Sequence, residues 1–130
     1  MKKIGILLLV MVFLLAGCSS QEKAKEIPVV TKITAAEAKA MIDQGQDLVI
    51  LDVRTQEEYN EAYIKNAILI PDTEISGQAP TILADKDQTI LVYCRTGRRS
   101  AEAAKKLVDM GYTNIYDFGG ILDWPYEVVN

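Results

Sequence analysis

The chain has 130 residues, of which 49% are apolar and 25% charged, and its acidic side chains outnumber the basic ones by 18 to 14. This length leaves room for one domain of ordinary globular composition. The acidic balance argues against a nucleic-acid partner, because affinity for phosphate backbones comes from Lys and Arg. Histidine is absent and cysteine occurs only as Cys18 and Cys94, which excludes a Cys-His nucleophile pair and an ordinary structural zinc site.

The chain begins with the pattern of a secretory signal. Lys2 and Lys3 are followed by an apolar run at residues 4–15 and then by small residues. A permanent transmembrane anchor is the alternative, but the run is shorter than the roughly 20 apolar residues that a spanning helix needs. We therefore predict that residues 1–17 are a signal peptide that is removed.

Residues 15–18, Leu-Ala-Gly-Cys, resemble the bacterial lipobox. The resemblance implies that Cys18 is acylated and becomes the first residue of the mature chain, and more than one acyl chain gives stable attachment to a membrane. The residues after Cys18 are polar, so residues 18–31 are predicted to be a lipidated cysteine and a polar tether. We expect residues 32–130 to form one domain in the cell envelope, on the extracytoplasmic side of the membrane.

Removal of the signal changes the balance of charge and cysteine. Twelve basic and 18 acidic side chains remain, a net charge of −6. We therefore expect the lipid, rather than a basic surface patch, to attach the chain to the membrane. With Cys18 acylated, Cys94 has no disulfide partner in its own chain. A thiol-disulfide oxidoreductase would need a second cysteine, which argues against that class.

Helix and strand patterns alternate along the predicted domain. Capping boxes, Thr34 with Glu37 and Thr55 with Glu58, predict the starts of two helices. Apolar runs without alternation predict strands buried on both faces, at residues 48–51, 67–70 and 89–93. A last short strand is predicted at residues 114–117. A longer helix is predicted at residues 100–110, whereas residues 72–88 show no clear element beyond a helical turn at 81–84. This alternation predicts an α/β fold with a mainly parallel sheet and helices on both faces.

The residues that carry chemistry lie between the strand at 89–93 and the following helix. Cys94 is followed by five residues with side chains or backbone suited to anions, namely Arg95, Thr96, Gly97, Arg98 and Arg99. A loop that enters a helix N-terminus presents free N–H groups to a ligand, and Gly97 gives it the freedom to turn. We expect this loop to bind oxyanions and to hold Cys94 as an accessible nucleophilic thiolate that is open to oxidation.

The alternative is that Cys94 is a small core residue at the end of a strand, as free cysteines often are. The three neighbouring arginines argue against it, because cationic groups accompany reactive rather than structural cysteines. A thiolate that attacks sulfur carried by an oxyanion needs no general base, since the leaving group departs as an anion. The absence of histidine is therefore compatible with sulfur transfer.

Residues 94–100, Cys-Arg-Thr-Gly-Arg-Arg-Ser, resemble the active-site loop C-R-x-G-x-R-S of the rhodanese-family sulfurtransferases. Three other segments resemble the family in the same order along the chain. They are the D-V-R-x-x-x-E-Y segment at 52–59, the A-x-x-I-P segment at 67–71, and the closing segment with Gly111, Gly119, Gly120 and Trp124. Together these segments cover nearly the whole predicted domain.

The resemblance implies a three-layer α/β/α fold around a five-stranded, mainly parallel sheet. It implies that Cys94 accepts sulfur as a covalent persulfide, without any other cofactor, and that residues 95–99 bind a small donor such as thiosulfate. A thiol or a cyanide-like molecule would then take the sulfur. Asp52 and Arg54 are expected to be structural or rim residues with a role in a salt bridge rather than in catalysis. Trp124 is expected to be a packing aromatic rather than a ligand contact, and the chain to be a monomer.

The chain departs from the family at residues 62–67, Ala-Tyr-Ile-Lys-Asn-Ala, where the usual pattern is G-H-I-x-G-A. The loss of two glycines and a histidine is expected to change the local turn and the rim of the cleft. It leaves the nucleophile and its loop unchanged.

Two other kinds of function compete with sulfur transfer. A phosphatase or arsenate reductase of related fold would use a longer loop, with five residues between cysteine and arginine, whereas Arg99 follows Cys94 after four. A persulfide-carrying or sensing module of the envelope would keep the loop but show little turnover, and the sequence does not separate it from an enzyme. Neither alternative changes the residues expected to act.

Overall fold

A five-stranded parallel sheet forms the centre of the protein in the computed structural model, which describes Gly17 and residues 27–130. The strand order is β1-β6-β5-β2-β4, and every neighbouring pair is parallel. The strands are β1 (Thr31–Lys32), β2 (Leu48–Asp52), β4 (Ile68–Leu69), β5 (Thr89–Cys94) and β6 (Asn114–Gly120). Two short strands, β3 (Tyr63–Ile64) and β7 (Val128–Val129), form a separate antiparallel pair.

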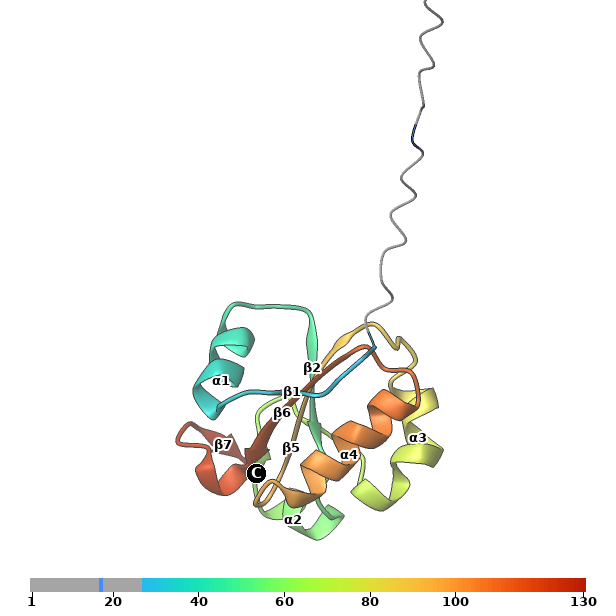
Figure 1. Cartoon of the computed structure of the whole chain (residues 1–130). Coiled ribbons are helices and arrows are strands. Elements are labelled where there is room, and N and C mark those ends of the chain that lie inside the picture. The colour runs from blue at the N-terminus through green and yellow to red at the C-terminus, as the bar shows by residue number, and fades with distance from the viewer. Residues whose placement is uncertain (1–16, 18–26) are drawn as a thin grey trace, which may run out of the picture.

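Helices cover both faces of this sheet (Figure 1). They are α1 (Ala35–Asp43), α2 (Gln56–Glu61), α3 (Ile75–Ile82) and α4 (Arg98–Asp109), with 3-10 turns η1 (Asp72–Glu74) and η2 (Ile121–Asp123). Residues of β5 alternate between the two sides: Ile90 and Val92 pack with α3 and α4, whereas Leu91 and Tyr93 pack with α1 and the C-terminal segment. The predicted three-layer α/β/α fold is therefore confirmed.

The two predicted capping boxes are present. The Thr34 hydroxyl accepts the Glu37 amide at 3.1 Å while the Glu37 carboxylate accepts the Thr34 amide at 3.3 Å. Thr55 and Glu58 exchange the corresponding bonds at the start of α2. Each box satisfies amides that a helix start leaves without a partner, so the sequence signal and the structure agree.

The prediction for residues 72–88 was wrong in extent, because the expected turn at 81–84 overlaps only the end of α3. The buried helix residues Ile75 and Ala79 and the buried C-cap residue Leu83 are four apart and form one apolar stripe. Pro80 and Gly77 both lie inside the helix, although proline and glycine are the two poorest helix formers. Long-range packing on the sheet and α4 thus outweighs local propensity.

The N-terminal part of the described chain runs beside the start of β6. Residues 27–29 line a surface cavity together with Thr31, Thr113 and Asn114. Residues 1–16 of the predicted signal peptide, Cys18 and residues 19–26 of the predicted tether lie outside the described residues. In the described part, no helix combines the length and apolar character required to cross a membrane.

Candidate active site

The candidate nucleophile lies where the central strand of the sheet ends. β5 ends at Cys94 and α4 begins at Arg98, two residues earlier than predicted, because Gly97 acts as the N-cap residue with φ +108°. Residues with a side chain rarely adopt a positive φ, so this turn favours glycine. The loop therefore lies beyond the carboxyl ends of parallel strands, where ligands bind in open α/β sheets.

Cys94 is enclosed by this loop. Its side chain is 1% exposed, and its Sγ accepts a hydrogen bond from the Gly97 amide at 3.0 Å. The expectation of an openly accessible thiol was therefore wrong, because the sulfur lies at the base of the loop and packs against the core. The same N–H group that covers the sulfur also stabilises negative charge on it.

The start of α4 supplies further donors. In the first backbone hydrogen bond of the helix, the Ala101 N–H donates to the Gly97 carbonyl at 3.2 Å. The amides of Arg98, Arg99 and Ser100 therefore precede the intrahelical ladder. These N–H groups and the positive end of the helix dipole make the loop suited to an anion, such as a thiolate, a persulfide or an oxyanion.

Gly119 and Gly120 of β6 lie against the other side of the loop. Pairing between β5 and β6 shifts register so that Cys94 lies opposite Gly120. A Cβ atom on Gly120 would overlap the carbonyl oxygen of Arg95, and the same oxygen accepts the Leu122 amide at 3.2 Å. The buried Ser100 hydroxyl bonds to the Gly97 and Gly119 carbonyls at 3.1 and 3.4 Å. Two adjacent strands thus fix the loop.

Asp117, which the sequence analysis did not single out, holds this glycine turn. The carboxylate is fully buried, and its Oδ1 accepts the amide of Gly119, whose φ is +88°. Its Oδ2 lies 3.1 Å from the Lys32 ammonium, within ion-pair distance but without hydrogen-bond geometry. A short polar residue two positions before a glycine turn was the available signal.

Arg99 forms an ion pair with Glu58 of α2 rather than presenting a free guanidinium. Its two terminal nitrogens donate to the two Glu58 oxygens at 2.8 and 2.9 Å. This bidentate bond lowers the pKa of Glu58 to about 2, against the opposing effect of burial, and raises the pKa of Arg99. Glu58 was expected only as a capping residue, yet it also joins α2 to the loop.

Asp52 and Arg54 form the expected salt bridge, with 2.7 Å between Arg54 Nη2 and Asp52 Oδ2. The Tyr93 hydroxyl donates to the same carboxylate at 2.7 Å and accepts the Ile64 amide at 3.1 Å. Burial opposes the charge of Arg54, but the Asp52 carboxylate outweighs it and raises the Arg54 pKa. Burial and the same carboxylate raise the pKa of Tyr93. This network joins β2, β5 and β3 below the site.

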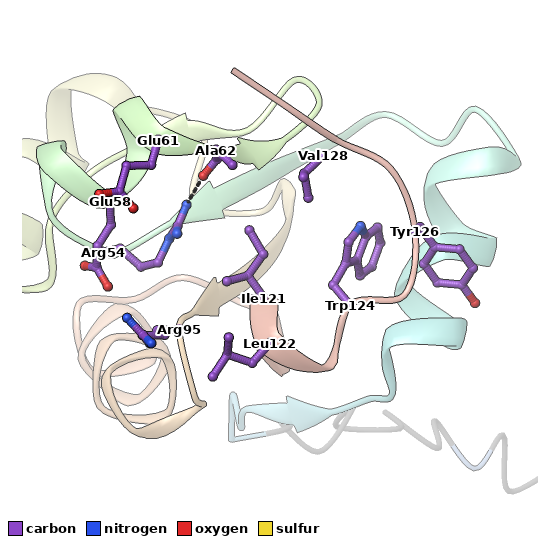
Figure 2. Close-up of a pocket in the computed structure, with 10 residues that line it drawn as sticks. All are labelled: Arg54, Glu58, Glu61, Ala62, Arg95, Ile121, Leu122, Trp124, Tyr126 and Val128. Atoms are coloured by element: carbon purple, nitrogen blue, oxygen red, sulfur yellow. Dashed lines mark hydrogen bonds between the residues drawn. The ribbon is translucent and has the colours of Figure 1, made fainter.

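A cavity of about 350 Å³ adjoins the loop (Figure 2). One wall consists of Arg54 and the α2 segment, and the opposite wall of C-terminal apolar and aromatic residues. The lining residues are Arg54, Glu58, Glu61, Ala62, Arg95, Ile121, Leu122, Trp124, Tyr126 and Val128. Arg95 is the predicted loop residue that reaches this cavity, whereas Thr96 in the loop and Arg98 at the start of α4 are exposed to solvent. Trp124 is 8% exposed and packs in the core, as expected.

The unusual segment at 62–67 keeps the turn that glycine would provide. Asn66 has φ +69°, in the left-handed region that Asn tolerates better than most residues. Tyr63 stacks on Tyr59 with ring centroids 4.2 Å apart. The Ala62 carbonyl accepts Arg54 Nη2 at 2.7 Å, drawn in Figure 2. The turn is therefore retained, while Tyr63 changes the surface beside α2.

Comparisons with known proteins agree with this geometry. The chain is 40% identical over 73 residues to the thiosulfate sulfurtransferase PspE of Escherichia coli, covering 56% of this chain and 70% of that protein. It is 34% identical over 97 residues to the probable adenylyltransferase/sulfurtransferase MoeZ of Mycobacterium tuberculosis, covering 74% of this chain but 25% of that protein. The solved structure of a rhodanese with anions from E. coli matches with a TM-score of 0.60 and 36% identity, covering 64% of this chain and 98% of that one.

The family model of the rhodanese-like domain matches residues 34–126. This range contains the loop at 94–99, the Glu58–Arg99 ion pair and the glycine turn that Asp117 holds. Proteins named as sulfurtransferases are among the relatives that the chain resembles. The chain therefore belongs to the rhodanese-like domain family.

Proposed function

We propose that this protein is a sulfurtransferase that moves sulfane sulfur from a small oxyanion donor to a thiophilic acceptor through a persulfide on Cys94. The observation that carries the proposal is the bond from the Gly97 amide to Cys94 Sγ, at the base of a loop that opens a helix. The family and its thiosulfate sulfurtransferase relatives support the same chemistry.

With thiosulfate as donor, the Cys94 thiolate attacks the outer sulfur of the donor. A bond forms between Cys94 Sγ and that sulfur, the bond to the sulfonate sulfur breaks, and its electron pair leaves with sulfite. The leaving group needs no proton, so the reaction requires no histidine. The N–H groups of the loop donate hydrogen bonds, and Arg95 supplies positive charge, at the place where the anionic sulfur donor and the persulfide must be held.

The test is the intact mass of the full chain, purified in detergent, before and after incubation with thiosulfate. We expect one added sulfur, its removal by cyanide, and no addition to a Cys94→Ala variant. A parent chain that gains no sulfur from thiosulfate or from another sulfane donor would contradict the proposal, provided that the parent is folded by circular dichroism.

A persulfide carrier with little turnover is the second candidate, because Cys94 is only 1% exposed and an outer sulfur would be sheltered. Steady-state formation of thiocyanate from thiosulfate and cyanide separates the two. Rapid multiple turnover supports the enzyme, whereas a single loading that cyanide discharges slowly supports the carrier.

We also propose that the chain is a lipoprotein of the cell envelope, anchored through Cys18. The proposal rests on the signal pattern at residues 1–17 and on the lipobox-like residues 15–18. It would place sulfur transfer on the extracytoplasmic side of a membrane.

A further inference from the structure

The cavity beside the loop is suited to the molecule that takes the sulfur, an inference that rests on the proposed function. It includes Arg95, the residue that follows Cys94. Its volume of about 350 Å³ falls in the range of small-molecule sites. An acceptor bound there would therefore lie next to the loop that is proposed to hold the persulfide.

Four charged residues line the cavity, and two of them are neutralised within the protein. Arg54 is paired with Asp52, and both oxygens of Glu58 are bonded to Arg99. Arg95 and Glu61 are exposed, and neither takes part in an ion pair within the described part of the chain. The cavity thus offers one uncompensated cation beside Cys94 and one uncompensated anion at the end of α2.

The opposite wall is apolar and open to solvent. Leu122 is 63% exposed and Val128 is 41% exposed, and both face the cavity together with Ile121 and Trp124 (Figure 2). Exposed apolar side chains that gather around a cavity mark a binding face rather than chance exposure. Such a wall suits the methylene groups of a small ligand.

We propose that the cavity binds the sulfur acceptor as an amino-acid thiol, with its carboxylate at Arg95, its ammonium at Glu61 and its carbon chain on the apolar wall. The acceptor thiolate would form a bond with the outer sulfur of the Cys94 persulfide. The bond between that sulfur and Cys94 Sγ would break, and its electron pair would return to Cys94 as a thiolate. The exchange is balanced and needs no oxidant or reductant.

Four probe thiols distinguish the effect of the acceptor's carboxylate from the effect of its ammonium group. Cysteine carries both, 3-mercaptopropionate only the carboxylate, cysteamine only the ammonium, and 2-mercaptoethanol neither. The full chain is loaded with thiosulfate, and the rate of sulfur loss to each thiol is followed by intact mass. Each rate is divided by the rate of the same thiol with a free small persulfide, which removes intrinsic reactivity. We expect each matching charge to raise the normalised rate about fivefold.

Two variants assign these charges. Glu61→Gln is expected to remove the advantage of the ammonium group, so that cysteamine reacts no faster than 2-mercaptoethanol after normalisation. Arg95→Gln is expected to remove the advantage of the carboxylate. The control is Glu57→Gln, an equal loss of charge at an exposed position of the same helix that does not line the cavity. Equal normalised rates for all four thiols, or the same loss in the Glu57 variant, would overturn the inference.

Binding without transfer gives an independent test. Trp124 is the only tryptophan in the sequence and lines the cavity, so its fluorescence reports occupancy. S-methylcysteine keeps the carboxylate and ammonium but transfers no sulfur. We expect S-methylcysteine to cause a saturable change in Trp124 fluorescence, and we expect weaker binding in the Glu61→Gln and Arg95→Gln variants. The absence of a fluorescence change would overturn the inference. A chain that binds this probe but never loads sulfur would instead contradict the proposed function alone.

Discussion

Gly120 lies against the carbonyl group of Arg95, where a Cβ atom would overlap backbone rather than a movable side chain. Gly120→Ala must therefore push the loop away from β6, and we expect a loss of about 3 kcal/mol in the free energy of unfolding. We also expect slower loading of sulfur on Cys94. Urea titration and intact mass measure the two effects.

Gly77→Ala is the matched control. Gly77 lies in α3, has an ordinary φ, and a Cβ atom there would meet nothing within 4 Å. Alanine is the better helix former by about 1 kcal/mol, so this variant should be slightly more stable and should load sulfur normally. Equal behaviour of the two glycine variants would show that the contact at Gly120 does not constrain the loop.

The Glu58–Arg99 pair predicts a pH dependence of stability. The Glu58 pKa is lowered from 4.5 to about 2 in the folded chain, so the pair stabilises fully above about pH 4.5 and is lost as the pH falls toward 2. The side chains are 21–23% exposed, and allowing for solvent screening the contribution is about 2 kcal/mol. Glu58→Gln should remove it, while glutamine can still complete the capping box.

Urea titrations of the parent and Glu58→Gln chains at pH 7, 5, 4 and 3 check this. The difference between the two unfolding free energies should be largest at pH 7 and shrink below pH 4.5. Glu57→Gln, at an exposed position, is the control, and its unfolding free energy should differ little from that of the parent at every pH. A Glu58 difference that does not change with pH would mean that the ion pair contributes nothing.

Single residues could be predicted where local sequence determines them. The loop at 94–99 and the salt bridge of Asp52 with Arg54 are examples, since their partners are close in sequence. The partners of Arg99 and Asp117 could not be predicted. Glu58 is 41 residues from Arg99, and Lys32 reaches Asp117 only because β1 pairs with β6. Burial of Cys94 likewise depends on how strand, loop and α4 pack together.

Three strands meet at the Tyr93 hydroxyl, which donates to Asp52 of β2 and accepts the Ile64 amide of β3. Tyr93→Phe would leave both buried groups without this partner, and we expect it to cost about 2 kcal/mol of unfolding free energy. Tyr116→Phe is the control, because no hydrogen bond to the Tyr116 hydroxyl occurs within the described residues. Thermal and urea unfolding of both variants measure the difference, and equal costs would refute the role of the network.

The elements that could be predicted are those with a local signal. Capping boxes located the starts of α1 and α2, and unbroken apolar runs located β2, β4 and β5. The two-residue strands β1, β3 and β7 carry no pattern of their own, because pairing partners alone define them. α3 was missed because Gly77 and Pro80 hide an apolar stripe that packing on the sheet and α4 stabilises.

At the scale of the whole molecule, the proposed anchor predicts where the protein is found. The full chain should fractionate with membranes and incorporate labelled palmitate, because acylation of Cys18 would add several buried methylene groups. Cys18→Ser should lose both properties, whereas Cys94→Ser should keep them. A Cys18→Ser chain that remains with membranes as strongly as the parent would contradict lipidation at this residue.

The common direction of the five strands gives the molecule two unlike poles. Residues 27–29 run beside the beginning of β6, at one pole, while Cys94 ends β5 at the other (Figure 1). An attachment through the N-terminal segment, as proposed, would therefore join the pole opposite to the loop that is proposed to carry sulfur. That arrangement favours sulfur exchange with solutes in the surrounding water over exchange with sulfur dissolved in the lipid.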